Sequence, residues 1–571
     1  MAVSKKSSED LVNVQVDGHW IRVPKGTRMI EACKQAAAEV PHYCYHPKLT
    51  SPGNCRMCLV EMGMPPRPTP GEEAELDAEG HAKINWMPRP VIACANTVAE
   101  GMGIRTQSLL AKECRQGVME FLLINHPLDC PICDQAGECT LQEYSVEHGN
   151  GQSRFLESKV KKPKNVDIGP RIRLDDERCV LCSRCVRFSK EVVDDDVLGF
   201  VDRGSHNTLA VHPDRKLENN YSLNTVDICP VGALTSNDFR FKMRVWFMRE
   251  TKSLCTGCAR GCNTLIGSRE GKIYRQGPRE NNKVNSAWMC DSGRMEYHRL
   301  EDPARLTDPM IKRGRTHNVV DWTEAICRAA KDLSRFKGDE LAIIASGGMT
   351  NEELYLTRTL AESLEAGVVD VVKRSGSGDD YLSHSDKNPN VNGARKILKL
   401  RSPGSRLKLI HAGIAEGKIK ALLVLGEDLL DIGFSEEELG GLKCMVLVHM
   451  IANPTAKMST VVLPGAGYAE KRGSMINATG RLQRLNKAID SPGLSREDWE
   501  ILQGLNRAVD GKDEVTELVD VFGEMTSAVS IFKGLSFAGI GDLGVDVMDT
   551  GESVPLLERE AKRVRDGLIV G

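Results

Sequence analysis

The chain contains the stretch Cys179-Val180-Leu181-Cys182-Ser183-Arg184-Cys185, and a further cysteine stands downstream in the pair Cys229-Pro230. Three cysteines separated by two residues each, with a distant Cys-Pro, have the spacing of a [4Fe–4S] cluster site. A fold with two such clusters would repeat the three-cysteine pattern close to Cys229, and the sequence has no second copy there. We therefore predict that one [4Fe–4S] cluster is bound by Cys179, Cys182, Cys185 and Cys229.

The other cysteines are concentrated in the same half of the chain. The 571 residues include 19 cysteines, and all except Cys327 and Cys444 lie at or before Cys290. The N-terminus lacks the apolar core of a secretory signal and the Arg-rich composition of a transit peptide. Without export, metal or redox use of the thiols is favoured over disulfides. The two halves of the chain therefore differ in chemistry.

Composition limits the class of protein further. This length predicts about three or four domains, and 41% hydrophobic with 27% charged residues excludes a mostly disordered or fibrous chain. A net charge of −3 leaves no overall electrostatic footprint for nucleic acid. No apolar run approaches the ~20 residues of a membrane-spanning helix, so we expect partner subunits to hold the chain at any membrane.

A second cluster site is predicted upstream of the first stretch. His126 is followed by three cysteines, and Pro127 and Pro131 stiffen the loop between them. An imidazole in place of one thiolate makes a cluster less anionic, which changes its reduction potential. We predict a [4Fe–4S] site with the ligands His126, Cys130, Cys133 and Cys139. A zinc site with the same donors stays open on spacing alone.

A third site is predicted near the N-terminus. Cys44, Cys55 and Cys58 are spaced like the ligands of a plant-type [2Fe–2S] ferredoxin loop, although the first spacing is wider. We expect Cys94 to be the fourth ligand, with Cys114 as its competitor. Zinc is the weaker alternative here. Cys33 falls on a predicted helix, where a core position is expected.

A fourth site is predicted downstream of Cys229-Pro230. Cys255, Cys258, Cys262 and the more distant Cys290 suit a [4Fe–4S] cluster at the entrance to a larger domain, and structural zinc is again weaker. The cysteines outside the four sets need no role beyond packing. Four arginines adjacent to predicted ligands could donate hydrogen bonds to sulfur and offset cluster charge. They are Arg56, Arg184, Arg187 and Arg260.

Hydrophobic patterns predict the elements that carry these sites. Residues 11–23 alternate around Asp17-Gly18, which is a hairpin signal, and residues 29–40 form an Ala-rich helix ended by Pro41. Proline-rich residues 62–90 are expected to form a surface loop or a hairpin excursion inserted in the first domain, residues 105–125 a helix, and residues 154–173 a connector. From about residue 300, short apolar strands starting near Leu341, Ile419 and Lys443 alternate with helices, which predicts a mostly parallel α/β sheet.

The order of the four sets resembles the large iron–sulfur subunit of respiratory complex I over essentially the whole chain. The C-terminal half is similar to the molybdopterin-oxidoreductase fold. The strings that carry this second likeness are Ser346–Glu353, Gly417–Gly426 and Val461–Gln483.

The resemblance implies a multidomain protein of α/β and α+β class. Its parts are a β-grasp [2Fe–2S] ferredoxin-like domain (1–104), a helical segment with the one-His, three-Cys site (105–150), a [4Fe–4S] ferredoxin-like domain (151–244), a [4Fe–4S] entry subdomain (245–300) and a molybdopterin-oxidoreductase-like α/β domain (301–571). The last domain is short for a catalytic molybdenum subunit, and Cys327 and Cys444 lie on helix-like and strand-like segments. We therefore expect no molybdopterin.

The implied activity is electron relay from an NADH/flavin subunit toward quinone-side iron–sulfur subunits, as part of an NADH:quinone oxidoreductase. The implied cofactors are one [2Fe–2S] and three [4Fe–4S] clusters. No substrate-converting site is expected in the chain itself. The expected location is peripheral, on the cytoplasmic side of a bacterial inner membrane, held by partner subunits and without nucleic acid.

Three alternative functions remain. One is the catalytic subunit of an NAD-linked molybdenum or tungsten formate dehydrogenase, which stoichiometric metal and formate-dependent dye reduction would identify. Another is the iron–sulfur subunit of an NAD-coupled hydrogenase, which would not need the large C-terminal domain. The third is a zinc-stabilised scaffold, which would be colourless and free of iron.

Overall fold

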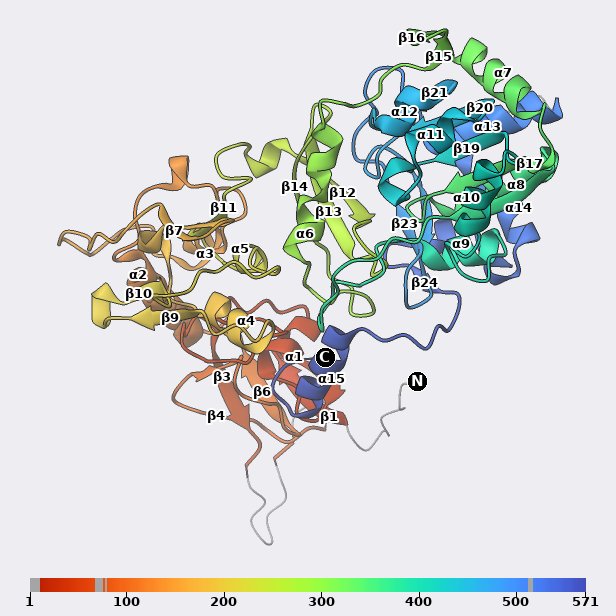
Figure 1. The fold of residues 1–571 in the computed structure, drawn as a ribbon. Helices are drawn as coiled ribbons and strands as arrows, with labels where there is room; N and C mark the ends of the chain where they lie inside the picture. Colours follow the sequence, from red (N-terminus) through yellow and green to blue (C-terminus); the bar gives the residue numbers. More distant parts are fainter. Residues whose placement is uncertain (1–10, 67–74, 77–79, 512–516, 571) are drawn as a thin grey trace. The chain divides into compact units, whose positions relative to one another are not determined.

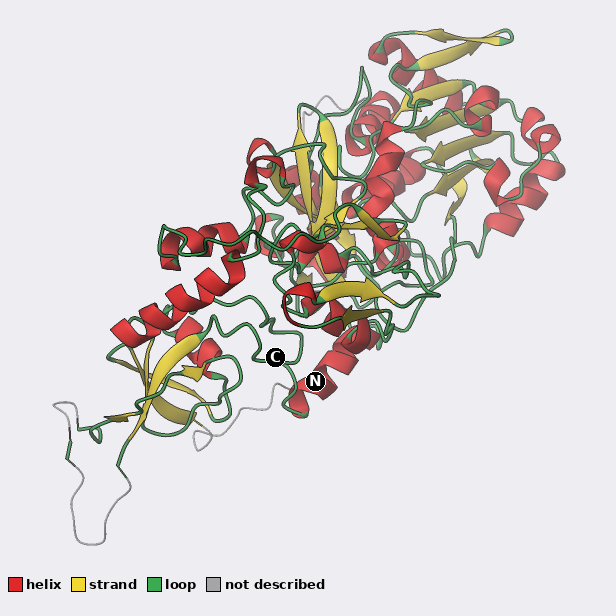
Figure 2. Ribbon diagram, turned by 90° about the vertical axis from the view of Figure 1, so that its left-hand side faces the viewer, coloured by secondary structure: helices red, strands yellow, loops and turns green. Residues whose placement is uncertain are grey.

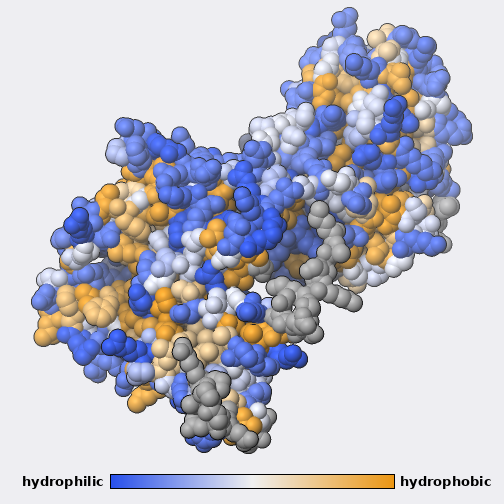
Figure 3. Space-filling view, turned by 90° about the horizontal axis from the view of Figure 1, so that it is seen from below, coloured by the Kyte–Doolittle hydropathy of each residue, from blue (hydrophilic) through white to orange (hydrophobic). Residues whose placement is uncertain are grey.

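The computed structural model describes residues 11–66, 75–76, 80–511 and 517–570. The chain forms two compact units, one made of Met1–Trp246 with Glu560–Gly571 and the other of Phe247–Arg559. Within the described ranges, no helix is long and apolar enough to span a bilayer. Hydrophilic and hydrophobic residues are interspersed on the face of the molecule that Figure 3 presents.

The first unit begins with the predicted hairpin. Strands β1 (Leu11–Val16) and β2 (His19–Pro24) pair antiparallel around Asp17 and Gly18, whose positive φ angles of 47° and 91° suit a tight two-residue turn. The sheet continues through β6 (Met102–Arg105), β3 (Leu59–Met64) and β4 (Asn85–Trp86), with β5 (Val91–Ile92) paired to β3. Buried apolar residues of this sheet pack on α1 (Met29–Gln35) to form the domain core.

One sequence expectation needs correction here. The predicted helix 29–40 ends at Gln35, well before Pro41, because Ala37 takes a left-handed conformation with φ 56°. For residues 62–90 the structure favours the hairpin alternative, because the end of β3 pairs antiparallel with β4, while residues 67–74 and 77–79 lie outside the described part.

The rest of the first unit is built from short elements around the cysteine loops. The predicted helix 105–125 is confirmed as α2 (Leu109–Leu123), with the Ser108 hydroxyl accepting from Ala111 N at its start. The predicted connector 154–173 is wrong at its end, where β7 (Val166–Gly169) pairs with β8 (Ile172–Leu174), and β8 pairs with β11 (Leu234–Ser236). The elements are α3 (Thr140–His148), β7 (Val166–Gly169), β8 (Ile172–Leu174), α4 (Arg184–Glu191), β9 (Leu198–Val201), β10 (Thr208–Val211), α5 (Asn224–Asp227) and β11 (Leu234–Ser236).

The second unit opens with a three-stranded antiparallel sheet, followed by a seven-stranded sheet (Figure 1). The small sheet consists of β12 (Arg249–Leu254), β13 (Asn263–Arg269) and β14 (Lys272–Pro278), followed by α6 (Asp291–Arg294). The large sheet has the order β16-β15-β21-β20-β19-β17-β18, and its strands from β21 to β18 are parallel, as predicted. They are β15 (Met310–Arg313), β16 (Thr316–Val319), β17 (Gly338–Ala345), β18 (Ala366–Val371), β19 (Ala421–Leu425), β20 (Cys444–His449) and β21 (Val461–Pro464).

Alternate residues of the parallel strands face two different apolar cores. Leu341 and Ile343 join the core with α7, α8, α13 and α14, whereas Ala342 and Ile344 join the core with α10, α11 and α12. The sheet is therefore covered on both faces, which explains its continuous apolar strands (Figure 2). The helices of these cores are α7 (Trp322–Leu333), α8 (Asn351–Ser363), α9 (Val391–Ile397), α10 (Leu407–Ala415), α11 (Glu436–Gly440), α12 (Pro454–Met458), α13 (Asp498–Asp510) and α14 (Leu518–Ala528). The last helix of the chain is α15 (Pro555–Arg565), whose residues from Glu560 onward belong to the first unit. A last sheet contains β22 (Gly473–Ile476), β23 (Arg481–Leu485) and β24 (Val545–Asp546).

Candidate iron–sulfur cluster sites

The set nearest the N-terminus along the chain, the predicted [2Fe–2S] ligands (the first set), converges from three loops of the N-terminal domain. Cys44 follows α1, Cys55 and Cys58 precede β3, and Cys94 follows β5. The thiol of Cys94 interacts with those of Cys44 and Cys58, and the thiol of Cys55 interacts with that of Cys44. The interaction with Cys44 lowers the pKa of Cys94, but Cys58 and burial outweigh it and raise this pKa to about 11. The structure therefore brings all four predicted residues together.

The competitor Cys114 lies elsewhere. It is on α2, half-buried, where burial and Glu113 raise the pKa of its thiol and Arg115 lowers it. Cys33 lies in the core of the N-terminal domain, and burial raises its pKa to about 12. The geometry thus favours Cys94 over Cys114 as the fourth member of the first set.

The one-His, three-Cys set is carried by one loop at the start of α3. The thiols of Cys133 and Cys139 both interact with Cys130, which is exposed. The pKa of His126 is lowered to about 4, first by burial and then by the charges of Arg178 and Lys159. His126 is therefore neutral near pH 7, and a neutral ring nitrogen is the form that binds a metal.

A glycine leaves room beside this set. A Cβ atom at Gly232 would lie 2.3 Å from Cys133 Sγ, which is closer than any real Cβ contact. Gly232 follows Cys229-Pro230 of the C-x2-C-x2-C set, so the two sets share a backbone segment. Thr140 N also donates to Pro230 O at 3.2 Å. Because residue 232 is glycine, no side chain from this position occupies the space beside Cys133 Sγ, and a cluster bound to this sulfur would need such space.

The C-x2-C-x2-C set winds around the N-terminus of α4. Leu181 and Ser183 have left-handed φ angles of 53° and 60°, which non-glycine residues adopt at a cost in energy. This winding directs the thiols of Cys179, Cys182 and Cys185 toward one another and toward Cys229. Leu181 N donates to Cys179 Sγ at 3.4 Å, a contact that stabilises a thiolate.

The fourth set lies in the second unit, between β12 and α6. The thiols of Cys255, Cys258, Cys262 and Cys290 interact, and burial raises the pKa of Cys255 and Cys262 well above 9. Two backbone amides point at sulfur: Gly257 N donates to Cys255 Sγ and Gly293 N to Cys290 Sγ, both at 3.4 Å. A Cβ at Gly293 would lie 2.9 Å from Cys255 Sγ, so this cradle also fits a cluster.

Three of the four sets share one apolar core. In the first unit, Cys44 and Cys182 belong to the same buried cluster of side chains as Tyr43 and Met119, and the partly buried Cys139 packs against it. Cys139 and Cys55, from different sets, both raise the pKa of Tyr43 after burial and Tyr144. The three sets are therefore neighbours around one packed core.

A site for one metal ion needs a tighter group of ligands than an iron–sulfur cluster does. Among the residues that the structure describes, no three His, Cys, Asp or Glu side chains are grouped so as to hold one metal ion. An iron–sulfur cluster spreads its protein ligands over several irons joined by sulfide, so its ligands need not be grouped in this way.

The arginines beside the predicted ligands do not contact sulfur as expected. Arg184 and Arg187 donate to main-chain carbonyl oxygens of other loops, and Arg260 donates to Leu382 O at 3.1 Å. These three arginines therefore donate no hydrogen bond to cysteine sulfur. Their reach explains it, because a long guanidinium side chain extends past the adjacent thiol to the next loop. The expected offset of charge is supported: burial raises the pKa of Cys182 and of Cys262, while Arg184 and Arg187 lower the first and Arg260 lowers the second.

Comparison with known families matches the whole series of sites in order. Five family models align with the chain. They are a 2Fe-2S iron–sulfur cluster binding domain (9–109), the NADH-ubiquinone oxidoreductase-G iron–sulfur binding region (115–154), the ferredoxin-like domain of NADH-quinone oxidoreductase subunit 3 (169–235), the molybdopterin oxidoreductase Fe4S4 domain (248–302) and molybdopterin oxidoreductase (305–381 and 378–508).

Individual relatives carry names from the same family of proteins. The G subunit of NADH-quinone oxidoreductase from Rickettsia bellii is 36% identical over 517 residues, which cover 86% of this chain and 70% of the relative. The chain belongs to the G-subunit family of NADH-quinone oxidoreductase. The iron-sulfur protein 1 of mitochondrial NADH dehydrogenase [ubiquinone] from Solanum tuberosum is 37% identical, over 67% of this chain and 47% of that protein.

The predicted family and fold class are confirmed by these matches. The alignment with the G subunit from Rickettsia felis, 37% identical over 62% of this chain, spans about half of that relative, namely 49%. A solved NAD+-reducing [NiFe]-hydrogenase in the H2-reduced state covers 41% of this chain and 91% of its own, at 26% identity and a TM-score of 0.34.

The molybdopterin-oxidoreductase-like domain has a cavity of about 400 Å³ at the carboxyl ends of its parallel strands. It is lined by Ser346 after β17, Gly426 after β19, His449 of β20 and Lys471. Cys444 stands at the opposite end of β20, and Cys327 is exposed on α7.

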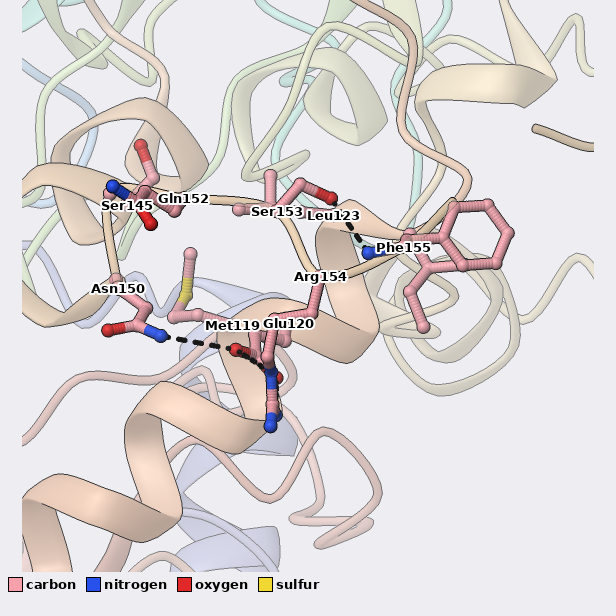
Figure 4. A pocket seen from close by; sticks show the side chains of 12 residues that line it. Met119, Glu120, Leu123, Ser145, Asn150, Gln152, Ser153, Arg154 and Phe155 are labelled. Carbon is pink, nitrogen blue, oxygen red and sulfur yellow. Dashed lines mark hydrogen bonds and ion pairs between the residues drawn. The ribbon is translucent and has the colours of Figure 1, made fainter. Parts of the chain in front are cut away.

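A second pocket, of about 490 Å³, lies in the first unit between α2 and the loop after α3. Figure 4 shows the side chains of Glu120 and Arg154, which form an ion pair there, and Asn150, which donates to Glu120. The pocket contains none of the predicted ligands.

Proposed function

We propose that this chain is the iron–sulfur electron-transfer subunit of an NADH:quinone oxidoreductase, with one [2Fe–2S] and three [4Fe–4S] clusters. The proposed ligands are the sixteen residues of the four sets. The observation that carries the proposal is the common apolar core around Cys44, Cys139 and Cys182, one cysteine from each of three sets. Electron transfer between fixed centres needs short separations, and this core brings the three sets together in a packed medium.

Each protein residue in this scheme holds a group or shapes its surroundings. The bound clusters supply the chemistry, which is the reversible gain of one electron at a time. The thiolates would hold the iron, while the amides of Leu181, Gly257 and Gly293 donate to sulfur and would stabilise its negative charge. Because no proton or chemical group moves, the chain needs no general base and no nucleophile.

We further propose that the chain works with a flavin- and NADH-binding subunit on one side and quinone-side iron–sulfur subunits on the other. It would lie peripherally at the cytoplasmic side of the bacterial inner membrane, held by those partners. Family membership supports the assignment, because the relatives are named as subunits of NADH-quinone oxidoreductase.

The decisive experiment is a cluster inventory of the full chain. Iron and acid-labile sulfide assays should give about 14 iron atoms per chain, and EPR of the reduced protein should give signals from several distinct centres. A colourless protein with zinc, or a protein with only two irons, would contradict the proposal. Stoichiometric molybdenum or tungsten with formate-dependent dye reduction would replace it with a formate dehydrogenase.

A single substitution tests the unusual ligand. His126→Ala should remove one [4Fe–4S] EPR signal and leave the others, because the imidazole is one of four ligands to one cluster only. The matched control is His206→Ala, since His206 is exposed in a surface turn. Unchanged EPR spectra in His126→Ala would show that His126 is not a ligand.

A further inference from the structure

One arginine of the first unit contacts the ligand loops of two different cysteine sets. Arg187 lies on α4, directly after the C-x2-C-x2-C stretch. Its guanidinium donates to Cys44 O and to Thr50 O in the loop of the first set. The same group donates to Cys182 O at 3.4 Å. Arg187 thus joins the [2Fe–2S] loop to a [4Fe–4S] loop through the main chain of a proposed ligand on each side.

A second arginine of α4 makes a parallel connection. Arg184 donates to Tyr45 O at 2.5 Å, next to Cys44, and to Ile228 O at 3.2 Å, next to Cys229. The guanidinium group has five N–H donors in a planar fork, so one side chain reaches two loops at once.

Further hydrogen bonds hold the side chain of Arg187 and the loop that it contacts in place. Its Nε donates to Ser183 Oγ at 3.1 Å at the start of α4. Thr50, whose carbonyl it contacts, donates its own amide to Glu191 at 3.0 Å, and Arg563 also donates to Glu191. Arg563 belongs to the C-terminal segment that forms part of this unit. The first loop is therefore attached to α4 by charged groups at several points.

We propose that Arg187 is a positioning residue for electron transfer between the [2Fe–2S] set, to which Cys44 belongs, and the C-x2-C-x2-C set, to which Cys182 belongs. It holds the two sites at a constant separation, and its positive charge raises the reduction potential of both clusters. The electrostatic reason is that each cluster gains negative charge when it accepts an electron, and a nearby cation stabilises that reduced form. One electron leaves one centre and enters the other, with no bond formed or broken. The inference rests on the proposed function, since it presumes clusters at both sets.

The test compares three variants of the full chain with reconstituted clusters. Arg187→Met removes both the charge and the contacts, and Arg187→Lys keeps the charge with fewer directed donors. The control is Lys190→Met, which removes a positive charge from the same helix, because Lys190 is exposed and pairs with exposed Asp196. EPR-monitored redox titration gives the midpoint potential of each centre separately.

We expect Arg187→Met to shift two midpoint potentials, those of the [2Fe–2S] centre and one [4Fe–4S] centre, to more negative values. The other two should stay unchanged, and Lys190→Met should leave all four unchanged. Arg187→Lys should keep both potentials close to those of the unaltered chain, which a purely structural role would not predict. Unshifted potentials in Arg187→Met, or equal shifts in the Lys190 control, would overturn the proposal.

The outcome is separable from that of the proposed function. If the unaltered chain lacks the four clusters, the proposed function fails before the variants are compared. If the clusters are present and the potentials do not move, only the role of Arg187 fails. If Arg187→Met does not assemble its clusters, Arg187→Lys is the deciding variant. Midpoint potentials like those of the unaltered chain would support the charge effect. More negative potentials at both centres would contradict the charge effect.

Discussion

Lys471→Met is expected to destabilise the C-terminal domain strongly. Lys471 Nζ lies 2.9 Å from Glu353 and 2.7 Å from Asp498, and the three side chains are 6%, 0% and 16% exposed. Removing the ammonium leaves two carboxylates in the interior without their shared cation. Breaking a buried ion pair by removal of one partner costs about 3–5 kcal/mol.

The size of this effect depends on pH in a defined direction. Burial raises the pKa of Glu353 from 4.5 to about 7, although the charge of Lys471 lowers it. Without Lys471 this pKa rises further, so the folded state holds a proton that the unfolded chain releases above pH 4.5. A group of this kind stabilises the fold at low pH and loses that contribution as pH rises through its folded pKa. The cost of Lys471→Met should therefore be larger at about pH 8 than at about pH 6.

Hydrogen exchange of the amides in α8 and β22 is the appropriate assay, because it reports local stability in a chain of several domains. A loss of about 3–5 kcal/mol corresponds to exchange faster by on the order of 100-fold to several thousand-fold. The control is Lys337→Met, which breaks an equally short pair with Glu365 at 2.6 Å, but with both side chains more than half exposed. Such pairs contribute about 0–1 kcal/mol. Equal effects of the two substitutions would refute the argument from burial.

Two further predictions concern a buried carboxyl and a close approach to sulfur. Burial raises the pKa of Glu352 to about 7 while both its oxygens accept from Ser474, so stability should fall as pH rises from about 4.5 through 7, by up to about 3 kcal/mol. Urea unfolding at about pH 5 and about pH 8 should show this loss in the unaltered chain and a flatter profile in Glu352→Gln; an equally steep profile would contradict it. Gly232→Ala should abolish one [4Fe–4S] EPR signal, because its Cβ would lie 2.3 Å from Cys133 Sγ. Gly199→Ala, with open space around its Cβ, should leave every signal intact, and a normal spectrum in Gly232→Ala would show that the loop can move.

Short spacings were predictable from the sequence, whereas long ones needed the fold. Within Cys179–Cys185 the chain is too short for the thiols to lie far apart, so spacing alone defines a set. Cys94 and Cys114 are both distant from Cys58 along the chain, and the sequence left the choice open. Pairing of β3 with β5 brings Cys94 beside Cys58, with Ala93 N donating to Cys58 O at 3.0 Å. That pairing is a tertiary event with no local signal.

The role of the arginines could not be predicted for a related reason. Adjacency to a cysteine suggested contact with sulfur, but Arg187 reaches the carbonyl of Cys44, which is far away along the chain. The end of α1 at Gln35 was also not predictable from the local sequence pattern. Its Ala-rich pattern continues to Val40, and the chain leaves the helix at Ala37 with a left-handed φ of 56°.

The strings that carry the likeness to molybdopterin oxidoreductases have a structural explanation within this chain. Residues 346–353 and 461–483 lie against each other, since Glu353 pairs with Lys471 and Glu352 accepts from Ser474. A Cβ at Gly473 would lie 2.5 Å from Thr350, so the two segments also need glycine at their contact. Removing one partner of a buried pair leaves an uncompensated charge, so in this chain the two segments depend on each other for stability. The presence of these two strings therefore has a packing role in the domain and is not by itself evidence for a bound pterin.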